Sequence, residues 1–164
     1  MATSSEILKN KIQELLSYMG FDSQIFERVE EGRTVFNIKT HDAQLLIGKQ
    51  GANLEALQHI LRLLTKKNLE EQFMFAVDID DYKDKRTIYL KELARKAAHQ
   101  VRSSKRSVGL APMPAYERKV VHDYLSLYSD IVSESMGREP MRRIVIKYKG
   151  MAKSEEPFQF IENS

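Results

Sequence analysis

Apolar side chains recur along the first half of the chain at helical intervals in some segments and at alternating intervals in others. The opening helix is well signalled, because Thr3 and Glu6 have capping-box spacing and Gly20 can end the helix. In chain order the predicted elements are a helix at 3–19, strands at 24–30 and 34–40, helices at 42–47 and 52–64, and a strand at 73–80. This order, α-β-β-α-α-β, makes a complete small α+β unit with one sheet and helices on one face.

The second half of the chain is predicted to begin with a long charged helix, which is followed by shorter helices and strands. Pro112 and Pro114 disfavour helix just before them, and Pro114 suits a first helical position. The predicted elements are a helix at 82–102, a short strand within 108–114, a helix at 115–127, and strands at 130–135 and 142–149. The fold class is therefore α+β, with a second set of helices packed on a three-stranded sheet. The predicted domains are residues 1–81 and 82–150, followed by a loose tail at 151–164.

Composition narrows the class of protein. With 42% apolar and 30% charged residues over 164 positions, the chain can bury a core and is expected to fold. It contains no cysteine, which removes disulfides, thiolate metal sites and cysteine nucleophiles and fits a reducing cytosol. The first residues lack a signal-peptide pattern and no apolar run approaches the ~20 residues of a membrane span. We therefore expect an intracellular, soluble, cytoplasmic protein.

The net charge of +3 hides an uneven distribution. Residues 1–80 contain 9 Lys and Arg against 12 Asp and Glu, whereas residues 81–150 contain 16 against 8. Such asymmetry favours a polyanionic partner for the later segment, and a solvated helix face is the ordinary alternative.

Two glycines, Gly48 and Gly51, stand three apart inside the stretch "LLIGKQGANLEALQHIL". A glycine within a helix costs roughly 1 kcal/mol relative to alanine, so a helix-loop-helix explains the pair better than one interrupted helix. Backbone amides around the glycines, the start of the next helix and the charge of Lys49 would together suit a phosphate group. The apolar neighbours of the loop would line a groove for unstacked bases; these are Leu46, Ile47, Leu54 and Leu57. An ordinary turn between helices is the alternative.

The glycine spacing fits neither a nucleotide-binding P-loop nor a dinucleotide-binding fold, so no cofactor is expected. A Gly-x-x-Gly loop joining two helices within α-β-β-α-α-β resembles the KH domain in its type II order, whose loop clamps about four nucleotides of a single strand. The resemblance gives Gly48, Lys49, Gln50 and Gly51 the role of that clamp.

In "MPAYERKVVHDYL", Arg118 and His122 are four residues apart and share one side of a helix. Because four apolar or aromatic residues group on roughly the opposite side, we expect the pair to point outward; these are Tyr116, Val120, Val121 and Tyr124. Arginine offers a planar fork of donors for phosphate, and histidine can donate to phosphate or sugar and stack on a base.

The segments "LAPM", "ERKVVH", "SMGREP" and "RRIVI" resemble the R-three-H domain, which is associated with single-stranded nucleic acids. A KH unit followed directly by this domain is similar to the bacterial Jag family, also called KhpB or EloR, of RNA-binding proteins. The resemblance covers residues 22–150 and gives Arg118 and His122 the role of the naming pair. Its basic closing segment matches Arg138, Arg142 and Arg143.

The resemblance further implies cytoplasmic RNA regulation linked to cell elongation and division, and a partner that is a small, separate KH protein. Jag proteins often begin with an extra small domain, and residues 1–21 fit the first KH helix instead. The predicted ligand is single-stranded RNA, with single-stranded DNA as the alternative. A protein-interaction or homodimerisation module is the first rival function.

The second rival is a metal-dependent nuclease using Asp78, Asp80 and His99, although these residues lack recognisable ligand spacing. An acidic helix cap is the simpler role for this region, provided by Asp80 or Asp81 at the helix from Tyr82. The sequence therefore predicts a non-enzymatic RNA-binding protein.

Overall fold

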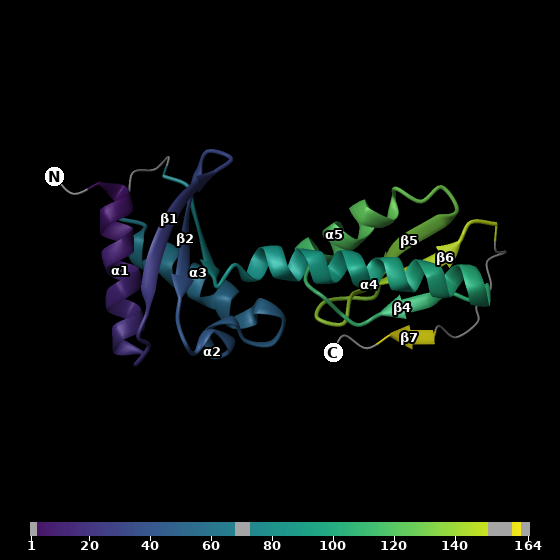
Figure 1. Cartoon of the computed structure of the whole chain (residues 1–164), viewed down its shortest axis with the longest axis horizontal. Coiled ribbons are helices and arrows are strands. Elements are labelled where there is room, and N and C mark those ends of the chain that lie inside the picture. The colour runs from purple at the N-terminus through teal and green to yellow at the C-terminus, as the bar shows by residue number, and fades with distance from the viewer. Residues whose placement is uncertain (1–2, 68–72, 151–158, 162–164) are drawn as a thin grey trace. The chain divides into compact units, whose positions relative to one another are not determined.

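The computed structural model describes residues 3–67, 73–150 and the backbone of 159–161 (Figure 1). The chain divides into two compact units, Met1–Lys83 and Asp84–Ser164, called unit 1 and unit 2 below. Helix α4 (Tyr82–Ser104) begins in unit 1 and belongs otherwise to unit 2. The described residues include no helix that is long and apolar enough to cross a membrane.

Unit 1 has the predicted α-β-β-α-α-β order. Its elements are α1 (Ser4–Tyr18), β1 (Gln24–Glu30), β2 (Arg33–Lys39), α2 (Ala43–Ile47), the single turn η1 (Lys49–Gly51), α3 (Ala52–Thr65) and β3 (Phe75–Ile79). Strands β1 and β2 form an antiparallel hairpin, and β3 pairs in parallel with β2, giving the sheet order β1-β2-β3. The predicted capping box is present, because the Thr3 hydroxyl accepts from the Glu6 amide while the Glu6 carboxylate accepts from the Thr3 amide.

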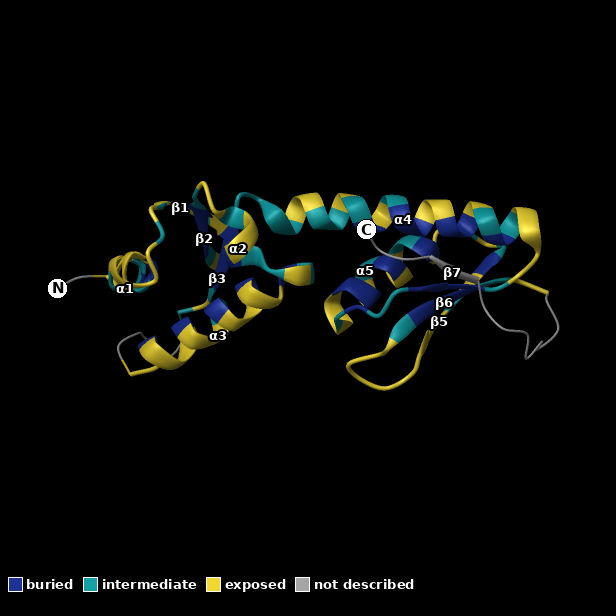
Figure 2. Ribbon diagram, turned by 90° about the horizontal axis from the view of Figure 1, so that it is seen from below, coloured by how far each residue is buried: buried dark blue, intermediate teal, exposed yellow. Residues whose placement is uncertain are grey.

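The core of unit 1 lies between the sheet and the helices α1, α2 and α3 (Figure 2). Phe36 and Ile38 of β2 are two residues apart and therefore face the helices together. The helices contribute a stripe of apolar side chains at helical spacing, which includes Leu8, Ile12 and Leu16 of α1 and Leu54, Leu57 and Leu61 of α3. These contacts hold α2 and α3 against the sheet on either side of the loop that joins them.

Unit 2 is also α+β, which confirms the predicted fold class for both halves. After α4 come β4 (Val108–Leu110), α5 (Ala115–Leu125), β5 (Ile131–Met136), β6 (Arg143–Tyr148) and β7 (Gln159–Ile161). Within the described residues the sheet has four strands in the order β5-β6-β4-β7, one more than predicted, because β7 pairs in parallel with β4. Strand β7 falls within the predicted loose tail, while residues 151–158 and 162–164 lie outside the described part of the chain.

The core of unit 2 joins α4 and α5 to one face of this sheet. Val121 and Leu125 of α5 meet Ile144 and Ile146 of β6, and the buried side of α4 completes the cluster. Ile144 and Ile146 are paired across β5 and β6 with Ser135 and Ser133. The polar side chains on β5 therefore share the helix-covered face with the core residues of β6.

Candidate nucleic-acid interface

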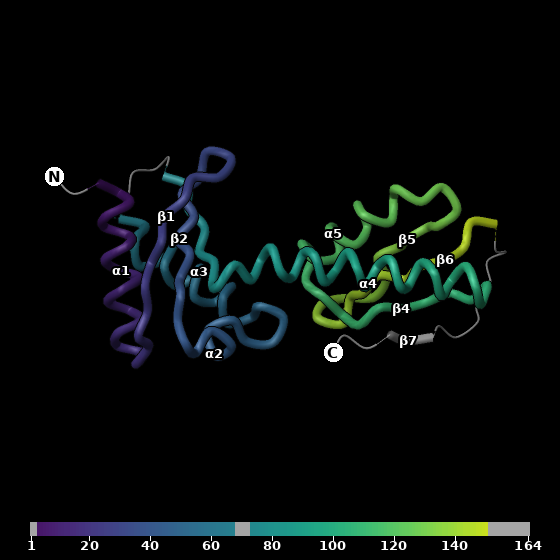
Figure 3. The backbone as a smooth tube through the Cα atoms, viewed as in Figure 1, coloured from purple at the N-terminus to yellow at the C-terminus, as the bar shows by residue number. Residues whose placement is uncertain are grey.

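The loop between α2 and α3 carries both predicted glycines, and its backbone is the helix-loop-helix expected from the sequence (Figure 3). Gly48, at the end of α2, has φ 69° and ψ −178°, a region that is essentially restricted to glycine. Gln50 (φ 53°) and Gly51 (φ 82°) then adopt left-handed conformations. Three residues with positive φ within four positions let the chain reverse between the two helices.

The amides of this loop fall into two groups. The Gly48 amide donates to a carbonyl of α2 at 3.0 Å, the Gly51 amide donates to Gly48 O at 3.3 Å, and the Ala52 amide donates to Lys49 O. In the described part of the chain, no acceptor is found for the amides of Lys49 and Gln50. The side chain of Lys49 is exposed, so these two amides and one ammonium group lie together at the loop tip.

Two side chains that sequence reasoning missed hold the loop in place. Asn53 donates from Nδ2 to the carbonyl of Leu45 at 2.8 Å, which ties the start of α3 to α2. A Cβ added at Gly48 would lie 2.5 Å from the Asn53 side chain, and one added at Gly51 would lie 3.0 Å from the Tyr82 ring. Both glycines are thus required by close packing as well as by backbone conformation.

The prediction of an apolar groove beside the loop is wrong for most of the side chains that were expected to line it. Leu46, Leu54 and Leu57 are buried in the core of unit 1, and Ile47 packs partly against the same core. The reason is that α2 and α3 turn these side chains onto the sheet, where burial removes apolar surface from water. They therefore stabilise the loop from below and offer no open surface to a base.

Exposed apolar side chains occur instead on the outer side of α2 and α3. Leu45 is 65% exposed, and on α3 Ile60, Leu63 and Leu64 are 45%, 62% and 52% exposed. Ile60 and Leu64 are four residues apart and Leu63 is three from Ile60, so the three side chains share one side of α3. This outer apolar row of α3 is a surface that can contact a partner.

In unit 1, Asp81, in the turn between β3 and α4, is hydrogen-bonded to side chains of β1 and β2. Asp81 accepts hydrogen bonds from Lys39, from Arg28 at 2.9 Å and from Asn37 at 2.7 Å. The bonds from Lys39 and Arg28 lower the pKa of Asp81 below its usual value. Asp81 therefore acts as a link between β1, β2 and the turn before α4.

The helix cap predicted at Asp80 or Asp81 is provided by Asp78 instead. The fully buried Asp78 carboxylate accepts the amides of Ile79 at 2.9 Å and Lys83 at 3.3 Å, and the second of these lies in the first turn of α4. Asp81 faces the cations of β1 and β2, which leaves the capping position to the strand residue. Among the described residues, no group of three or more His, Asp, Glu or Cys side chains is placed to hold a metal ion.

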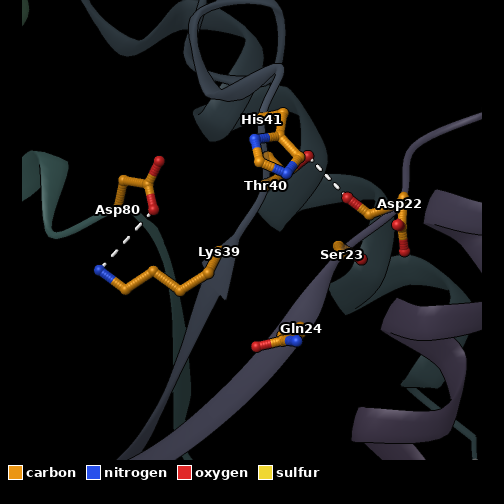
Figure 4. A pocket seen from close by; sticks show the side chains of 7 residues that line it. All are labelled: Asp22, Ser23, Gln24, Lys39, Thr40, His41 and Asp80. Carbon is orange, nitrogen blue, oxygen red and sulfur yellow. Dashed lines mark hydrogen bonds and ion pairs between the residues drawn. The ribbon is translucent and has the colours of Figure 1, made fainter.

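A polar hollow of about 310 Å³ lies where β1 begins and β2 ends (Figure 4). Its lining residues are Asp22, Ser23, Gln24, Lys39, Thr40, His41 and Asp80. Lys39 Nζ lies 3.7 Å from Asp80 Oδ1, and Thr40 donates to the carbonyl of Asp22 at 2.8 Å. Because its one lysine is already paired with a carboxylate, this hollow is poorly suited to a phosphate group.

In unit 2 the outward position predicted for Arg118 is wrong. Arg118 is only 7% exposed and shares the inner side of α5 with Val121 and Leu125. Its guanidinium donates to the carbonyl of Met113 at 2.8 Å and pairs with Glu139 at 2.7 Å. Arg118 therefore joins the start of α5 to the loop between β5 and β6.

A buried ion pair that was not predicted involves Glu117, the residue before Arg118. Glu117 is fully buried, and Arg86 of α4 binds both of its carboxylate oxygens, at 2.7 Å and 3.0 Å. The Tyr116 hydroxyl donates to the same carboxylate at 3.2 Å. This arrangement connects α4 to α5 through a two-pronged, charge-assisted contact.

His122 is exposed, as predicted, and its Nδ1 lies 2.7 Å from Ser133 Oγ on β5. Arg142 is also exposed, and its Nε donates to Ser135 Oγ at 2.9 Å. Arg138 is exposed in the loop between β5 and β6, whereas Arg143 is half-buried. The structure thus brings His122 and Arg142 to one strand and separates them from Arg118.

Comparison with known families matches two models in succession. A KH domain model matches residues 7–91, and an R-three-H domain model matches residues 89–148. The chain is also similar to curated proteins that carry the name RNA-binding protein KhpB. The one from Clostridium symbiosum is 32% identical over 90% of this chain and 69% of its own length.

For two further relatives with the same name, the match to this chain covers a smaller share of the relative's length. The protein from Bacillus subtilis is 40% identical over 73% of this chain and 59% of the relative. The protein from Lactiplantibacillus plantarum is 34% identical over 67% of this chain and 34% of the relative. The chain therefore spans between about a third and about two thirds of these three relatives.

Proposed function

The chain belongs to the KhpB (Jag-type) family of KH and R-three-H proteins, and from this premise we propose that it binds single-stranded RNA by its sugar-phosphate backbone. The proposal assigns a KH module to residues 1–81 and an R-three-H module to residues 82–150, with a tail at 151–164. It is a binding function without catalysis, and the name RNA-binding protein KhpB of the relatives supports RNA as the ligand.

The observation that carries the proposal is the tip of the glycine loop. Two adjacent amides, those of Lys49 and Gln50, have no acceptor in the described residues, and the exposed Lys49 side chain carries an ammonium group on the same loop. Amides that converge on one point form a partly positive concavity, and an ammonium group adds a full charge to it. A phosphodiester oxygen satisfies both donors, so the tip suits the backbone of a nucleic-acid strand.

The excess of Lys and Arg in residues 81–150 supports a contribution from unit 2. Contacts of this kind are made to phosphates and make the affinity dependent on salt, with little selection among sequences. We place the protein in the cytoplasm, which fits a cysteine-free sequence, and assign it to RNA regulation linked to cell elongation and division by family resemblance.

The loop assignment is tested by the double substitution Lys49→Asp/Gln50→Asp in the full chain. We expect the affinity for a short labelled single-stranded RNA to fall by about tenfold or more at moderate salt, since a phosphate contact is replaced by repulsion. Fluorescence anisotropy measures the affinity, and circular dichroism checks the fold.

The matched control is Lys11→Glu/Gln13→Glu, which makes the same change in net charge on exposed positions of α1. We expect this variant to keep most of the affinity. Equal losses in both variants would mean that the loop has no special role, and an unchanged loop variant would refute the assignment.

The outer apolar row of α3 favours a second candidate function, in which this surface binds another KH domain, either a separate small protein or a second copy. Light scattering after size-exclusion chromatography, with and without RNA, separates the candidates. A stable dimer that excludes RNA would favour the second.

A further inference from the structure

The turn between β3 and α4 has a backbone conformation that is unusual for its residues. Asp80 (φ 49°) and Asp81 (φ 56°) both adopt the left-handed conformation. In the described part of the chain, no other two adjacent residues that carry a Cβ do so. This conformation is unfavourable for a residue with a Cβ, although aspartate tolerates it better than most. Surrounding contacts are therefore needed to hold this strained turn in place.

Those contacts come from strands β1 and β2 of the unit 1 sheet. The Asp80 amide donates to Ile38 O at 3.0 Å, and the Asp81 amide donates to Asn37 Oδ1 at 3.4 Å. The Asp81 carboxylate is bound in addition by the three side chains of β1 and β2 described above. The sheet therefore fixes the conformation of the strained turn and the point at which α4 begins.

The residue that follows the strained turn lies against the glycine loop. Tyr82 is the first residue of α4 and is half-buried against the core of unit 1. A Cβ on Gly51 would lie 3.0 Å from Cε1 of the Tyr82 ring and 3.3 Å from its Oη. Gly51 is buried and forms the N-cap of α3 with φ 82°. The Tyr82 ring thus packs directly against the backbone of the loop, one residue after Gln50.

The other contacts of the glycine loop act at its flanks. Asn53 Nδ2 binds Leu45 O ahead of the loop, and the Gly51 amide forms a long bond of 3.3 Å to Gly48 O. The two amides at the loop tip have no acceptor in the described residues. Their direction therefore depends on how firmly the backbone on either side of them is held, and Tyr82 acts on the later side.

We propose that Tyr82 is a positioning residue for the RNA-binding loop. Its ring, whose place is set by the strained turn, holds the backbone that presents the amides of Lys49 and Gln50 to a phosphate. A loop that is already ordered binds more tightly, because binding then costs less conformational entropy. The inference rests on the proposed function for the nature of the ligand. It adds a role in RNA binding for Tyr82 and for the hydrogen bonds of Asp81.

The effect of Tyr82 on the loop is tested first without RNA. In Tyr82→Ala, the hydrogen-bonded amides of Gly51 and Ala52 are expected to exchange faster than in the wild type, because the backbone there loses its support. Phe21→Ala is the matched control, since Phe21 is also a partly buried aromatic residue of the unit 1 core but follows α1. Equal exchange of the loop amides in the two variants would overturn the role of Tyr82.

Affinity of the full chain for a short labelled single-stranded RNA is the second readout. Tyr82→Ala is expected to weaken binding roughly five- to tenfold, the cost of ordering a loosened loop. Tyr82→Phe keeps the ring and should retain most of the affinity, as should Phe21→Ala. If Tyr82→Phe lost as much affinity as Tyr82→Ala, the hydroxyl group and not the packing of the ring would matter, and the positioning role would be wrong.

A double-mutant cycle with Lys49→Ala shows whether Tyr82 acts through the loop. If it does, the combined variant loses less affinity than the product of the two single losses, because a misplaced loop gains little from Lys49. Single losses that multiply would mean that the two residues act independently, which contradicts the proposal.

The role of the strained turn is tested by Asp81→Ala. This change removes the hydrogen bonds that Asp81 accepts from β1 and β2, and it raises the net charge by one. Added positive charge by itself favours RNA binding. A severalfold loss of affinity is nevertheless expected, because the turn that places Tyr82 is no longer held. An unchanged or increased affinity would refute the coupling of the turn to the loop.

These measurements distinguish failure of this inference from failure of the proposed function. If Lys49→Asp/Gln50→Asp loses binding while Tyr82→Ala keeps wild-type affinity and exchange, the loop assignment stands and the role of Tyr82 is refuted. If Tyr82→Ala speeds exchange in the loop but both variants bind RNA as the wild type does, the loop is not the RNA site. The proposed function is then wrong, and the positioning role falls with it.

Discussion

Replacement of Gly48 by alanine is expected to lower the free energy of unfolding of unit 1 by about 2–3 kcal/mol. Two costs add at this position. The backbone has φ 69° and ψ −178°, a conformation that costs 1–3 kcal/mol for a residue with a Cβ, by general estimates. The new Cβ would also lie 2.5 Å from the side chain of Asn53, which cannot move without breaking its bond to Leu45.

Native-state hydrogen exchange read on peptides of α3 reports the stability of unit 1 separately from that of unit 2. The control is Gly32→Ala, because Gly32 also has a positive φ of 78° but has open space around its Cβ position. We expect a loss of about 1 kcal/mol for the control, the cost of the left-handed conformation alone. If the two variants lost the same free energy of unfolding, the contact of the new Cβ with Asn53 would contribute nothing measurable.

Replacement of Arg86 by alanine is expected to lower the free energy of unfolding of unit 2 by about 3 kcal/mol. The reason is that Glu117 is fully buried and would lose the guanidinium that binds both of its carboxylate oxygens, keeping the weaker contact with the Tyr116 hydroxyl. Removing one member of a buried ion pair leaves an uncompensated charge, which costs more than the pair contributed. Hydrogen exchange in peptides of α5 measures the loss.

Arg95→Ala is the matched control, because Arg95 forms a similar two-pronged pair with Glu92, but on the exposed side of α4. No measurable loss is expected there. The double variant Arg86→Met/Glu117→Met should recover most of the stability, since both charges leave together and apolar side chains fill the space. Failure of this rescue would point to a role of Arg86 other than pairing.

The parts of the fold that follow from local pattern could be predicted from the sequence. The capping box of Thr3 and Glu6 involves residues three apart, and the loop at Gly48 and Gly51 is marked by conformations that only a glycine takes readily. In such cases the side chains that decide the structure are close neighbours in the chain. The α-β-β-α-α-β order followed for the same reason.

The predictions that failed depended on contacts with residues outside the helix concerned. The spacing of Arg118 and His122 shows that they share a helix side, but whether Arg118 faces solvent is decided by Glu139 and the Met113 carbonyl. Similarly, Leu54 is apolar whether it lines a groove or fills a core, and only the position of the sheet decides between the two. The period of a sequence pattern predicts which residues share one side of a helix, but it does not predict what that side contacts.

The exposure of the candidate side chains was predictable to a similar extent. Lys49 is exposed, as expected for a loop tip, and His122 is exposed opposite the apolar side of α5, whereas Gln50 is half-buried. The contacts of Asn53 with Leu45 and of Ser133 with His122 were missed, because no spacing along the chain encodes contacts between different elements.

Strand β7 matters to anyone who shortens this protein for laboratory work. A cut at Gly150, which the composition of the last residues invites, would remove Gln159–Ile161 and strip β4 of its neighbour on that side. A bare row of backbone donors and acceptors recruits strands from other molecules, and precipitation during purification is its usual symptom. Aggregation of such a shortened protein would then reflect the exposed edge of β4 and would say nothing about RNA binding.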